Sequence, residues 1–172
     1  GATTLFDGQN TLAWSATGSP WAVQNGELVA GNGDLLTRAD FRDFFAHIEW
    51  WVPDNQGNAG EQDDGNSGIY LQDRYELQVL NSYGKPLTGL DDAGAIYAVA
   101  NASSNEARVP GQWQLYEITF RAARYDAFGN KTENARVTVD WNGVRIHRDL
   151  ELPDATPGAG LLESDTPGPL RL

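Results

Sequence analysis

The sequence contains no cysteine and no methionine. Without cysteine, neither disulfide bonds nor thiolate metal sites can form. Basic residues are scarce as well, since 12 Lys and Arg stand against 24 Asp and Glu and the formal net charge is −12. This charge disfavours nucleic acid and anionic membrane surfaces as partners, because both are bound through clustered Lys and Arg. From the acidic, cysteine-free composition we expect a secreted or periplasmic bacterial protein.

The chain also lacks a run of eighteen apolar residues, so no transmembrane helix is expected. Several motifs of well-defined chemistry are missing too. There is no glycine-rich phosphate loop between a strand and a helix, and no Gly-x-Ser-x-Gly nucleophile motif. The nitrogen ligands available for zinc are His47 and His147, with no thiolates to help them. Function must therefore be sought in other residue types.

What the sequence does have is a succession of short alternating segments separated by turns. The chain, residues 1–172, suits a single domain. Asn25-Gly26 and Asn142-Gly143 are dipeptides typical of tight hairpin turns. About ten short strands and no convincing helical stripe predict an all-β sandwich. The segments expected to form strands include residues 21–30, 34–37, 45–52, 66–81, 95–99, 113–121, 135–141 and 144–146, and residues 169–172 look like the beginning of another.

Residues 66–81 alternate with a period of two, as expected for one strand or for two strands around a bend at Asp73-Arg74. The apolar side chains of this segment should face the core, and they are Ile69, Leu71, Tyr75, Leu77 and Val79. The opposite face carries hydrogen-bonding side chains, namely Tyr70, Gln72, Arg74, Glu76 and Gln78. We interpret this polar face as the working surface. The alternative is an ordinary solvated face with an Arg74–Glu76 ion pair.

Residues 45–52 alternate in the same way. The side chains expected in the core are Ala46, Ile48, Trp50 and Val52, and those on the other face are Phe45, His47, Glu49 and Trp51. If this strand neighbours residues 66–81, the two polar faces form one surface. Glu49 and Glu76 would then resemble the carboxylate pair that shares acid and base roles in glycosidases. Trp51 and Tyr70 would stack on sugar rings, although half-buried core edges explain them nearly as well. His47 is either a general base or a hydrogen-bonded structural residue.

The loop from Asp54 to Asp64 carries four acidic residues and several glycines. Carboxylates and carbonyls are the hard oxygen ligands that Ca²⁺ prefers, so this loop could hold a divalent metal. The spacing matches no EF-hand, and a solvated acidic loop is the alternative reading. The sequence leaves the metal ligands unknown.

Several blocks of the sequence, in order along the chain, resemble the 3-keto-disaccharide hydrolase domain family, formerly a domain of unknown function. The blocks are Leu5-Phe6-Asp7-Gly8, residues 49–53, Asn66-Ser67-Gly68 with Ile69-Tyr70-Leu71, residues 75–84, residues 94–97, residues 110–114, residues 136–139 with Asn142-Gly143-Val144, and Gly168-Pro169-Leu170. The most specific blocks are Asn-Ser-Gly and Tyr-Glu-Leu-Gln-Val. The resemblance spans almost the whole chain and implies a concanavalin A-like jelly-roll β-sandwich of two antiparallel sheets.

The end of the sequence departs from this family pattern. In the family, the Gly-Pro-Leu block continues into a strand with a Gln-x-His-Gly motif and then into a last strand with an Arg-Asn-Ile-like motif. The sequence here ends at Leu172. The resemblance therefore implies a domain that lacks the last strands of the family. A sandwich without such a strand would expose unpaired backbone groups, so we expect another chain or segment to supply it.

The resemblance also implies action on 3-keto-glycosides. A ketone at C3 acidifies the C2 hydrogen, so that a general base can remove it and the glycosidic oxygen can leave by elimination, after which water adds back. Glu49 or Glu76 would be the base or a metal ligand. The residues that would bind the substrate are His47, Trp51, Asn66, Tyr70, Gln72, Arg74 and Gln78.

Two other functions stay open at this point. The same kind of sandwich is used by non-catalytic carbohydrate-binding modules, because a fold does not dictate a function. A structural domain for surface assembly is the third reading, since the chain is acidic and ends early relative to the family. The hydrolase and the binding module both act on a carbohydrate ligand, whereas the assembly domain does not require one.

Overall fold

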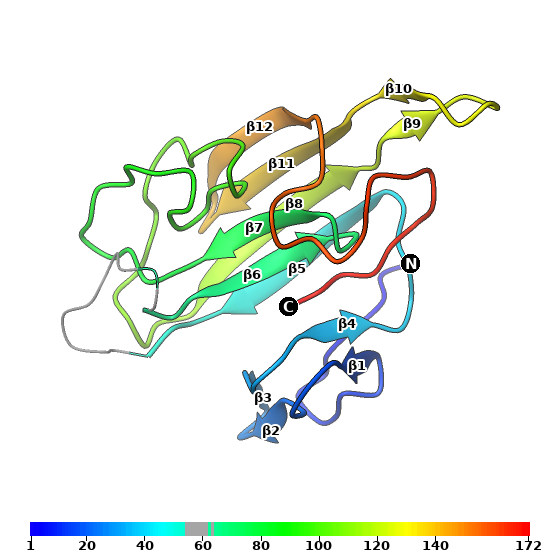
Figure 1. The fold of residues 1–172 in the computed structure, drawn as a ribbon. Coiled ribbons are helices and arrows are strands. Elements are labelled where there is room, and N and C mark those ends of the chain that lie inside the picture. The colour runs from blue at the N-terminus through cyan, green and yellow to red at the C-terminus, as the bar shows by residue number, and fades with distance from the viewer. Residues whose placement is uncertain (54–61, 63) are drawn as a thin grey trace.

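A computed structural model describes residues 1–53, 62 and 64–172 of the protein. Within these residues the chain forms twelve strands and no helix, so none could cross a membrane as a helix. The strands are β1 (Trp14–Ala16), β2 (Ala22–Gln24), β3 (Glu27–Val29), β4 (Leu35–Thr37), β5 (Phe44–Trp50), β6 (Ser67–Leu71), β7 (Tyr75–Val79), β8 (Gln114–Arg121), β9 (Arg124–Tyr125), β10 (Lys131–Glu133), β11 (Ala135–Trp141) and β12 (Val144–Leu152) (Figure 1).

The larger sheet has four antiparallel strands in the order β12-β11-β8-β5. Asn142 and Gly143, both at positive φ, form the predicted tight turn between β11 and β12. Alternate residues of these strands are buried, as in the pattern of β11, where Val137, Val139 and Trp141 are fully covered. The four-stranded sheet therefore has one apolar inner face and one solvated outer face.

The second sheet is assembled from segments that lie far apart in the sequence. β1 pairs with β4, and β6 pairs with β7. Residues 170–172 join the two pairs, because Arg171 bridges to Leu36 on one side and to Tyr70 on the other. The backbone hydrogen bonds on both sides of Arg171 are 2.8–3.1 Å long. Residues 169–172, expected to begin a strand, thus pair with both neighbours through isolated bridges at Arg171 and do not form a regular strand.

The inner faces of the two sheets enclose the core. Tyr75 of β7 packs against Phe120 of β8 with ring centroids 5.6 Å apart. The hydroxyl of Tyr116 in β8 donates to the Gln78 carbonyl of β7 across the sandwich, at 3.1 Å. These contacts confirm the predicted all-β sandwich and the predicted inward face of residues 66–81. Burial of this many aromatic and branched side chains is the main stabilising contribution.

The strand prediction for residues 95–99 needs correction. Residues 95–99 do not form a regular strand, because the chain turns back at Ala98 (φ 59°) and Ile96 makes isolated bridges to Leu77 and Ala100. For residues 66–81, the expected alternative of two strands around a bend is confirmed, because β6 and β7 flank a turn at residues 72–74. Gln72 and Asp73 both take positive φ there without help from glycine.

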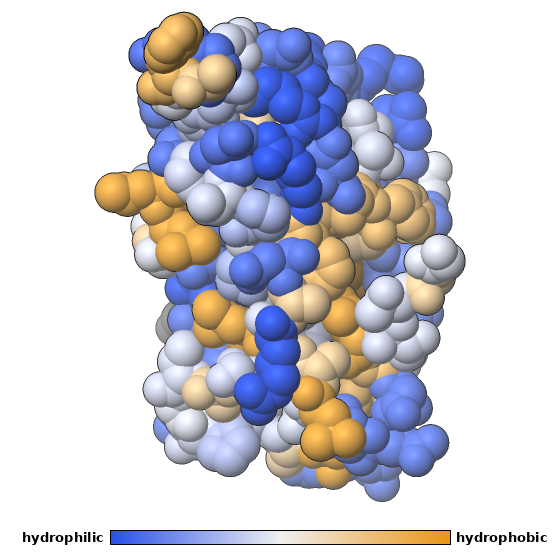
Figure 2. Space-filling view, turned by 90° about the vertical axis from the view of Figure 1, so that its right-hand side faces the viewer, coloured by the Kyte–Doolittle hydropathy of each residue, from blue (hydrophilic) through white to orange (hydrophobic). Residues whose placement is uncertain are grey.

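On the surface, exposed apolar side chains are interspersed with polar ones. Figure 2 shows this mosaic on the side that lies to the right in Figure 1, with hydrophilic residues covering much of its upper part. Scattered apolar residues of this kind are ordinary on protein surfaces. The functional site must therefore be located from specific clusters of side chains.

The β6–β7 turn is locked to the loop of residues 161–168 by a buried arginine. Arg74 is 2% exposed, and its Nε donates to the Leu162 carbonyl at 2.7 Å. Its Nη2 donates to the Ser164 hydroxyl at 2.7 Å, and its Nη1 to the Thr166 carbonyl at 3.2 Å. A guanidinium has five donors in a fixed plane, which suits this set of acceptors better than any other side chain.

Replacing Arg74 by Met should therefore lower the free energy of unfolding by about 3 kcal/mol, because several buried acceptors would lose their donor. Urea unfolding followed by tryptophan fluorescence measures this change. Arg148→Met is the matched control, since the Arg148 side chain is exposed and makes no hydrogen bond within the described residues. Equal stability of the two variants would contradict the anchoring role.

Candidate active site

The best-defined polar cluster lies on the outer face of the β6–β7 hairpin. In the β6–β7 register, Tyr70 is opposite Glu76 and Gly68 is opposite Gln78, so these four residues share one face. The Tyr70 hydroxyl donates to Glu76 Oε2 at 2.8 Å. The structure thus brings together three of the side chains that the sequence predicted for the site.

Gly68 makes the position of Glu76 possible. A Cβ atom on Gly68 would lie 2.3 Å from Glu76 Oε1 and 2.9 Å from its Cδ, so the carboxylate lies directly over the glycine. Gly158 has a similar relation to Tyr70, because a Cβ there would lie 2.7 Å from the Tyr70 hydroxyl. A glycine inside a strand often marks such a close approach.

Glu76 is almost covered, with 8% of its surface exposed. Burial raises the pKa of this carboxyl, while the Tyr70 hydrogen bond and the Arg171 charge lower it, and the net result is a raised pKa. Oε2 accepts the Tyr70 hydroxyl, whereas Oε1 has no donor among the residues that the structure describes. Glu76 therefore has one oxygen held in place and one available to accept a proton.

Arg171 fixes Tyr70 from the other side. Its guanidinium lies 3.7 Å from the centre of the Tyr70 ring. Its Nη1 is 3.0 Å from Asp34 Oδ2, and its Nε is 2.6 Å from Asp73 Oδ1, an ion pair without hydrogen-bond geometry. Burial and the Glu76 carboxylate raise the pKa of Tyr70, so this hydroxyl stays protonated and acts as a donor.

An amide cluster adjoins Glu76 on the same face. Gln78 is 1% exposed, and its Nε2 donates to the Asp91 carbonyl at 3.2 Å and to Asn66 Oδ1 at 3.4 Å. Its Oε1 is buried and has no hydrogen-bond partner in the described part of the chain. Asn66 is exposed at the rim of the cluster. These amides are suited to the hydroxyl groups of a ligand.

Gln72 and Arg74, predicted to bind substrate, lie instead in the turn that links β6 and β7. Gln72 Nε2 donates to the Phe41 carbonyl at 2.7 Å. Arg74 donates hydrogen bonds to the loop of residues 161–168. Strict alternation assigned both side chains to the polar face, but a turn interrupts the alternation. Their hydrogen-bonding groups hold loops in place and do not face the Glu76 cluster.

Glu49, His47 and Trp51 also lie elsewhere. They face outward from β5, or follow it, and β5 belongs to the four-stranded sheet and pairs there with β8. The expected common surface with residues 66–81 is therefore wrong, and so is the Glu49–Glu76 pair. Alternation with a period of two tells only which side chains point outward from a strand. β5 and the β6–β7 hairpin belong to different sheets, and the outward faces of two packed sheets point away from each other.

Arg171 and Gly68 are the members of the site that sequence reasoning did not assign. Gly68 inside an alternating strand was an available signal for close approach. Arg171 had no such signal, because its position between β4 and β6 follows from long-range strand pairing.

A divalent metal site finds no support in the described residues, which contain no group of three His, Asp or Glu side chains suited to an ion. Most of the acidic loop proposed for Ca²⁺, including Asp54, Glu61 and Asp63, lies outside the described residues. Asp64 is buried and accepts from Asn81 Nδ2 at 2.8 Å.

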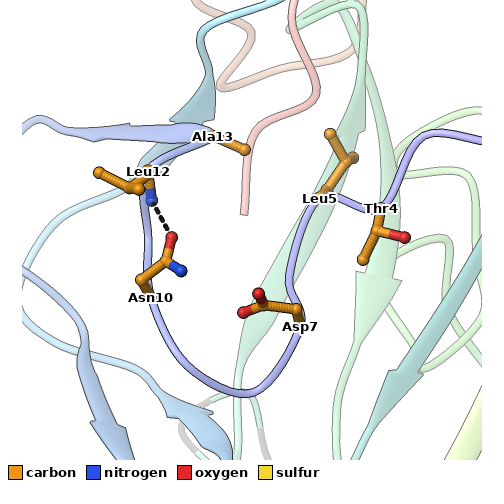
Figure 3. A pocket seen from close by; sticks show the side chains of 6 residues that line it. All are labelled: Thr4, Leu5, Asp7, Asn10, Leu12 and Ala13. Atoms are coloured by element: carbon orange, nitrogen blue, oxygen red, sulfur yellow. Dashed lines mark hydrogen bonds between the residues drawn. The ribbon is translucent and has the colours of Figure 1, made fainter.

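A separate cavity of about 190 Å³ lies in the N-terminal loop. Figure 3 shows Asp7 and Asn10 on the loop between Leu5 and Leu12. Asp7 Oδ1 accepts the Gln9 amide at 2.9 Å, and Asn10 Oδ1 accepts the Leu12 amide at 3.0 Å. Side chains that close turns in this way shape the loop, and the cavity offers no further acid or base.

Comparison with known proteins identifies the family of the chain. The sequence profile of the 3-keto-alpha-glucoside-1,2-lyase-like domain matches residues 1–172. The chain belongs to this family. The family resemblance predicted from the sequence is thereby confirmed. The Tyr-Glu-Leu-Gln-Val block forms β7, which carries Glu76 and Gln78.

Two solved structures from Parabacteroides distasonis, each described as a "putative glycosyl hydrolase", are similar to this family member. The first shares 34% identity with a TM-score of 0.88, and the match covers 98% of this chain and 74% of the other. The second shares the fold, with 18% identity, a TM-score of 0.65, and coverage of 98% and 85%. Among curated proteins no match was found. Family and first structure together support a carbohydrate-active role.

Changing Glu76 to Gln should make the protein more stable at neutral pH. The raised pKa means that the ionised carboxylate destabilises the folded state, and this cost grows as the pH rises above the ordinary value of 4.5. Glutamine keeps an oxygen for the Tyr70 hydroxyl and carries no charge. In urea unfolding at about pH 7, Glu76→Gln should have a larger free energy of unfolding than the wild type, and the difference should vanish at about pH 4.

The matched control is Glu27→Gln on β3, where Glu27 makes no ion pair within the described residues. It should show no pH-dependent gain. A Glu76→Gln variant that loses stability at neutral pH and regains it in acid would contradict the inferred electrostatics.

Proposed function

We propose that this domain cleaves 3-keto-glycosides and that Glu76 is the general base that removes the C2 proton. The observation that carries the proposal is the Glu76 carboxylate itself. It is nearly buried, its pKa is raised, one oxygen is held by Tyr70, and the other has no donor among the described residues. Such a carboxylate is a stronger base than an exposed one.

The reaction follows from the acidity of a hydrogen next to a ketone. Glu76 Oε1 takes the C2 proton, and the electron pair of that C–H bond forms an enolate with the C3 oxygen. The enolate then expels the glycosidic oxygen from C1, leaving a C1–C2 double bond. Water adds its hydroxyl to C1 and a proton to C2, and the leaving oxygen takes up a proton. Glu76, protonated by the C2 hydrogen, can then deliver a proton to the leaving oxygen or back to C2.

The neighbouring residues would orient the sugar. Tyr70 holds the carboxylate in one rotamer, which saves the entropy of fixing it during the reaction. Asn66 and Gln78 offer amide groups beside Glu76 for sugar hydroxyls. The Gln78 Oε1 acceptor, unpaired among the described residues, suits a hydroxyl donor.

The test is to incubate the protein with a 3-keto-disaccharide whose other unit is glucose and to measure the free glucose released. Glu76→Gln should lower kcat by about a hundredfold or more, because a general base contributes 10²–10⁴-fold. Glu27→Gln should match the wild type. Activity that persists in Glu76→Gln would rule out Glu76 as the base, and a wild type without activity would contradict the proposed enzymatic function.

The pH profile gives a second expectation. A general base works only when it is ionised, so kcat/KM should rise with pH through the pKa of Glu76. Because burial raises that pKa, the rise should be centred above the ordinary value of 4.5. A profile that falls as the pH increases through this region would point to an acid in place of a base.

A non-catalytic carbohydrate-binding role is the second candidate, because exposed indole rings lie on the other side of the sandwich. Trp51 and Trp113 are 40% and 44% exposed and pack edge to face, with ring centroids 6.4 Å apart. Exposed aromatic rings are ready to stack on sugar rings.

A further inference from the structure

A groove of about 320 Å³ lies on the outer face of the four-stranded sheet, opposite to Glu76. It runs over the beginning of β8, next to the last residues of β5 and the turn between β11 and β12. Its lining residues include Glu49, Trp113, Gln114, Leu115 and Glu117. Its volume is at the lower end of the range for small-molecule sites.

Trp113 gives the groove an aromatic wall. Its ring is 44% exposed, and Trp51 supports it through the edge-to-face contact. The Trp113 carbonyl accepts from Arg108 Nη1 at 2.8 Å, which ties down the backbone beneath the ring. The exposed face of the indole is a flat apolar surface on which a sugar ring can stack.

The polar groups of the groove are partly unused. Glu49 lies opposite Leu115 in the β5–β8 register, next to the His47–Glu117 pair, so two carboxylates flank Leu115 on one face. In the described part of the chain Glu49 has no partner, and the ion-pair contact of Glu117 is His47 at 3.9 Å. Both carboxylates can therefore accept hydroxyl groups.

Gln114 adds a donor from beneath the surface. It is 2% exposed, and its Oε1 accepts from Trp141 Nε1 at 3.0 Å and from the Arg108 amide at 3.2 Å. These bonds fix the orientation of the amide. Its Nε2 makes no hydrogen bond to the residues that the structure describes, so a nearly buried side chain at the groove has donors to spare.

We infer that this groove is a second carbohydrate site, which binds a neutral oligosaccharide away from the Glu76 face. A neutral sugar ring has an apolar face and vicinal hydroxyl groups. The groove offers an aromatic wall for the face, and two carboxylate acceptors and an amide donor for the hydroxyl groups. Glu49 and Glu117 outnumber Arg108, the cation in the lining of the groove, in a protein of net charge −12, and this balance disfavours uronic acids and sulfated sugars. The site would hold a polymer while the opposite face acts on a smaller sugar.

Isothermal titration with cellohexaose, maltohexaose and laminarihexaose tests this inference, with hexagalacturonate as the anionic counterpart. At least one neutral hexaose should bind, and hexagalacturonate should not. Trp113→Ala should weaken binding by about tenfold or more, which corresponds to about 1.4 kcal/mol. Glu117→Gln, an exposed change that cannot disturb the core, should weaken it by at least about threefold.

Phe128→Ala is the matched aromatic control, because Phe128 is 91% exposed at the β9–β10 turn and does not line the groove. It should bind like the wild type. Glu76→Gln should also bind the hexaose fully, which keeps this inference separate from the proposed reaction. The inference is overturned if no neutral hexaose binds, if Trp113→Ala and Glu117→Gln both bind normally, if hexagalacturonate binds more tightly, or if Glu76→Gln abolishes binding.

Discussion

The candidate active site depends on how Arg171 is held. Its backbone pairs with β4 and β6 at once, and its side chain lies on the Tyr70 ring between the carboxylates of Asp34 and Asp73. Tyr70 is thereby fixed, and its hydroxyl in turn fixes Glu76. Arg171 also lowers the pKa of Glu76, against the larger raising effect of burial. A carboxylate that is buried yet able to ionise follows from this balance.

Much of the fold could be predicted because alternation and turn dipeptides are local signals. Asn25-Gly26 and Asn142-Gly143 mark tight turns, and both lie at positive φ. The turn at Gln72 and Asp73 was harder to place, since Gln72 is not a usual choice for positive φ. Contacts from outside the hairpin stabilise it, such as the Gln72 bond to the Phe41 carbonyl. Interactions of this range cannot be read from local sequence.

The site was predicted only in part, for a similar reason. Tyr70, Glu76 and Gln78 were found together because they alternate along neighbouring strands of one hairpin. Glu49 was misplaced because alternation says only whether a side chain points inward or outward. Which sheet a strand joins depends on pairing across the whole chain, and β5 pairs with β8. Arg171 was missed because nothing in its local sequence indicates that it lies beside Tyr70.

The separation of the two outer faces gives each a distinct chemistry. The Glu76 face is compact, with buried amides and a base beside a glycine that leaves room for it. The Trp113 face is open, with exposed indoles and the carboxylates of Glu49 and Glu117. A sandwich provides both at little cost to the core, because its outward side chains do not contribute to the packing between the sheets.

The central claim is that Glu76 removes the C2 proton of a 3-keto sugar, and proton NMR in D₂O tests it most directly. As the substrate is cleaved by the wild type, the account predicts that the C2 proton signal of the 3-keto product is replaced by deuterium. With Glu76→Gln, neither cleavage nor exchange should occur above background. Cleavage that leaves the C2 proton in place, or exchange that continues without Glu76, would contradict the account.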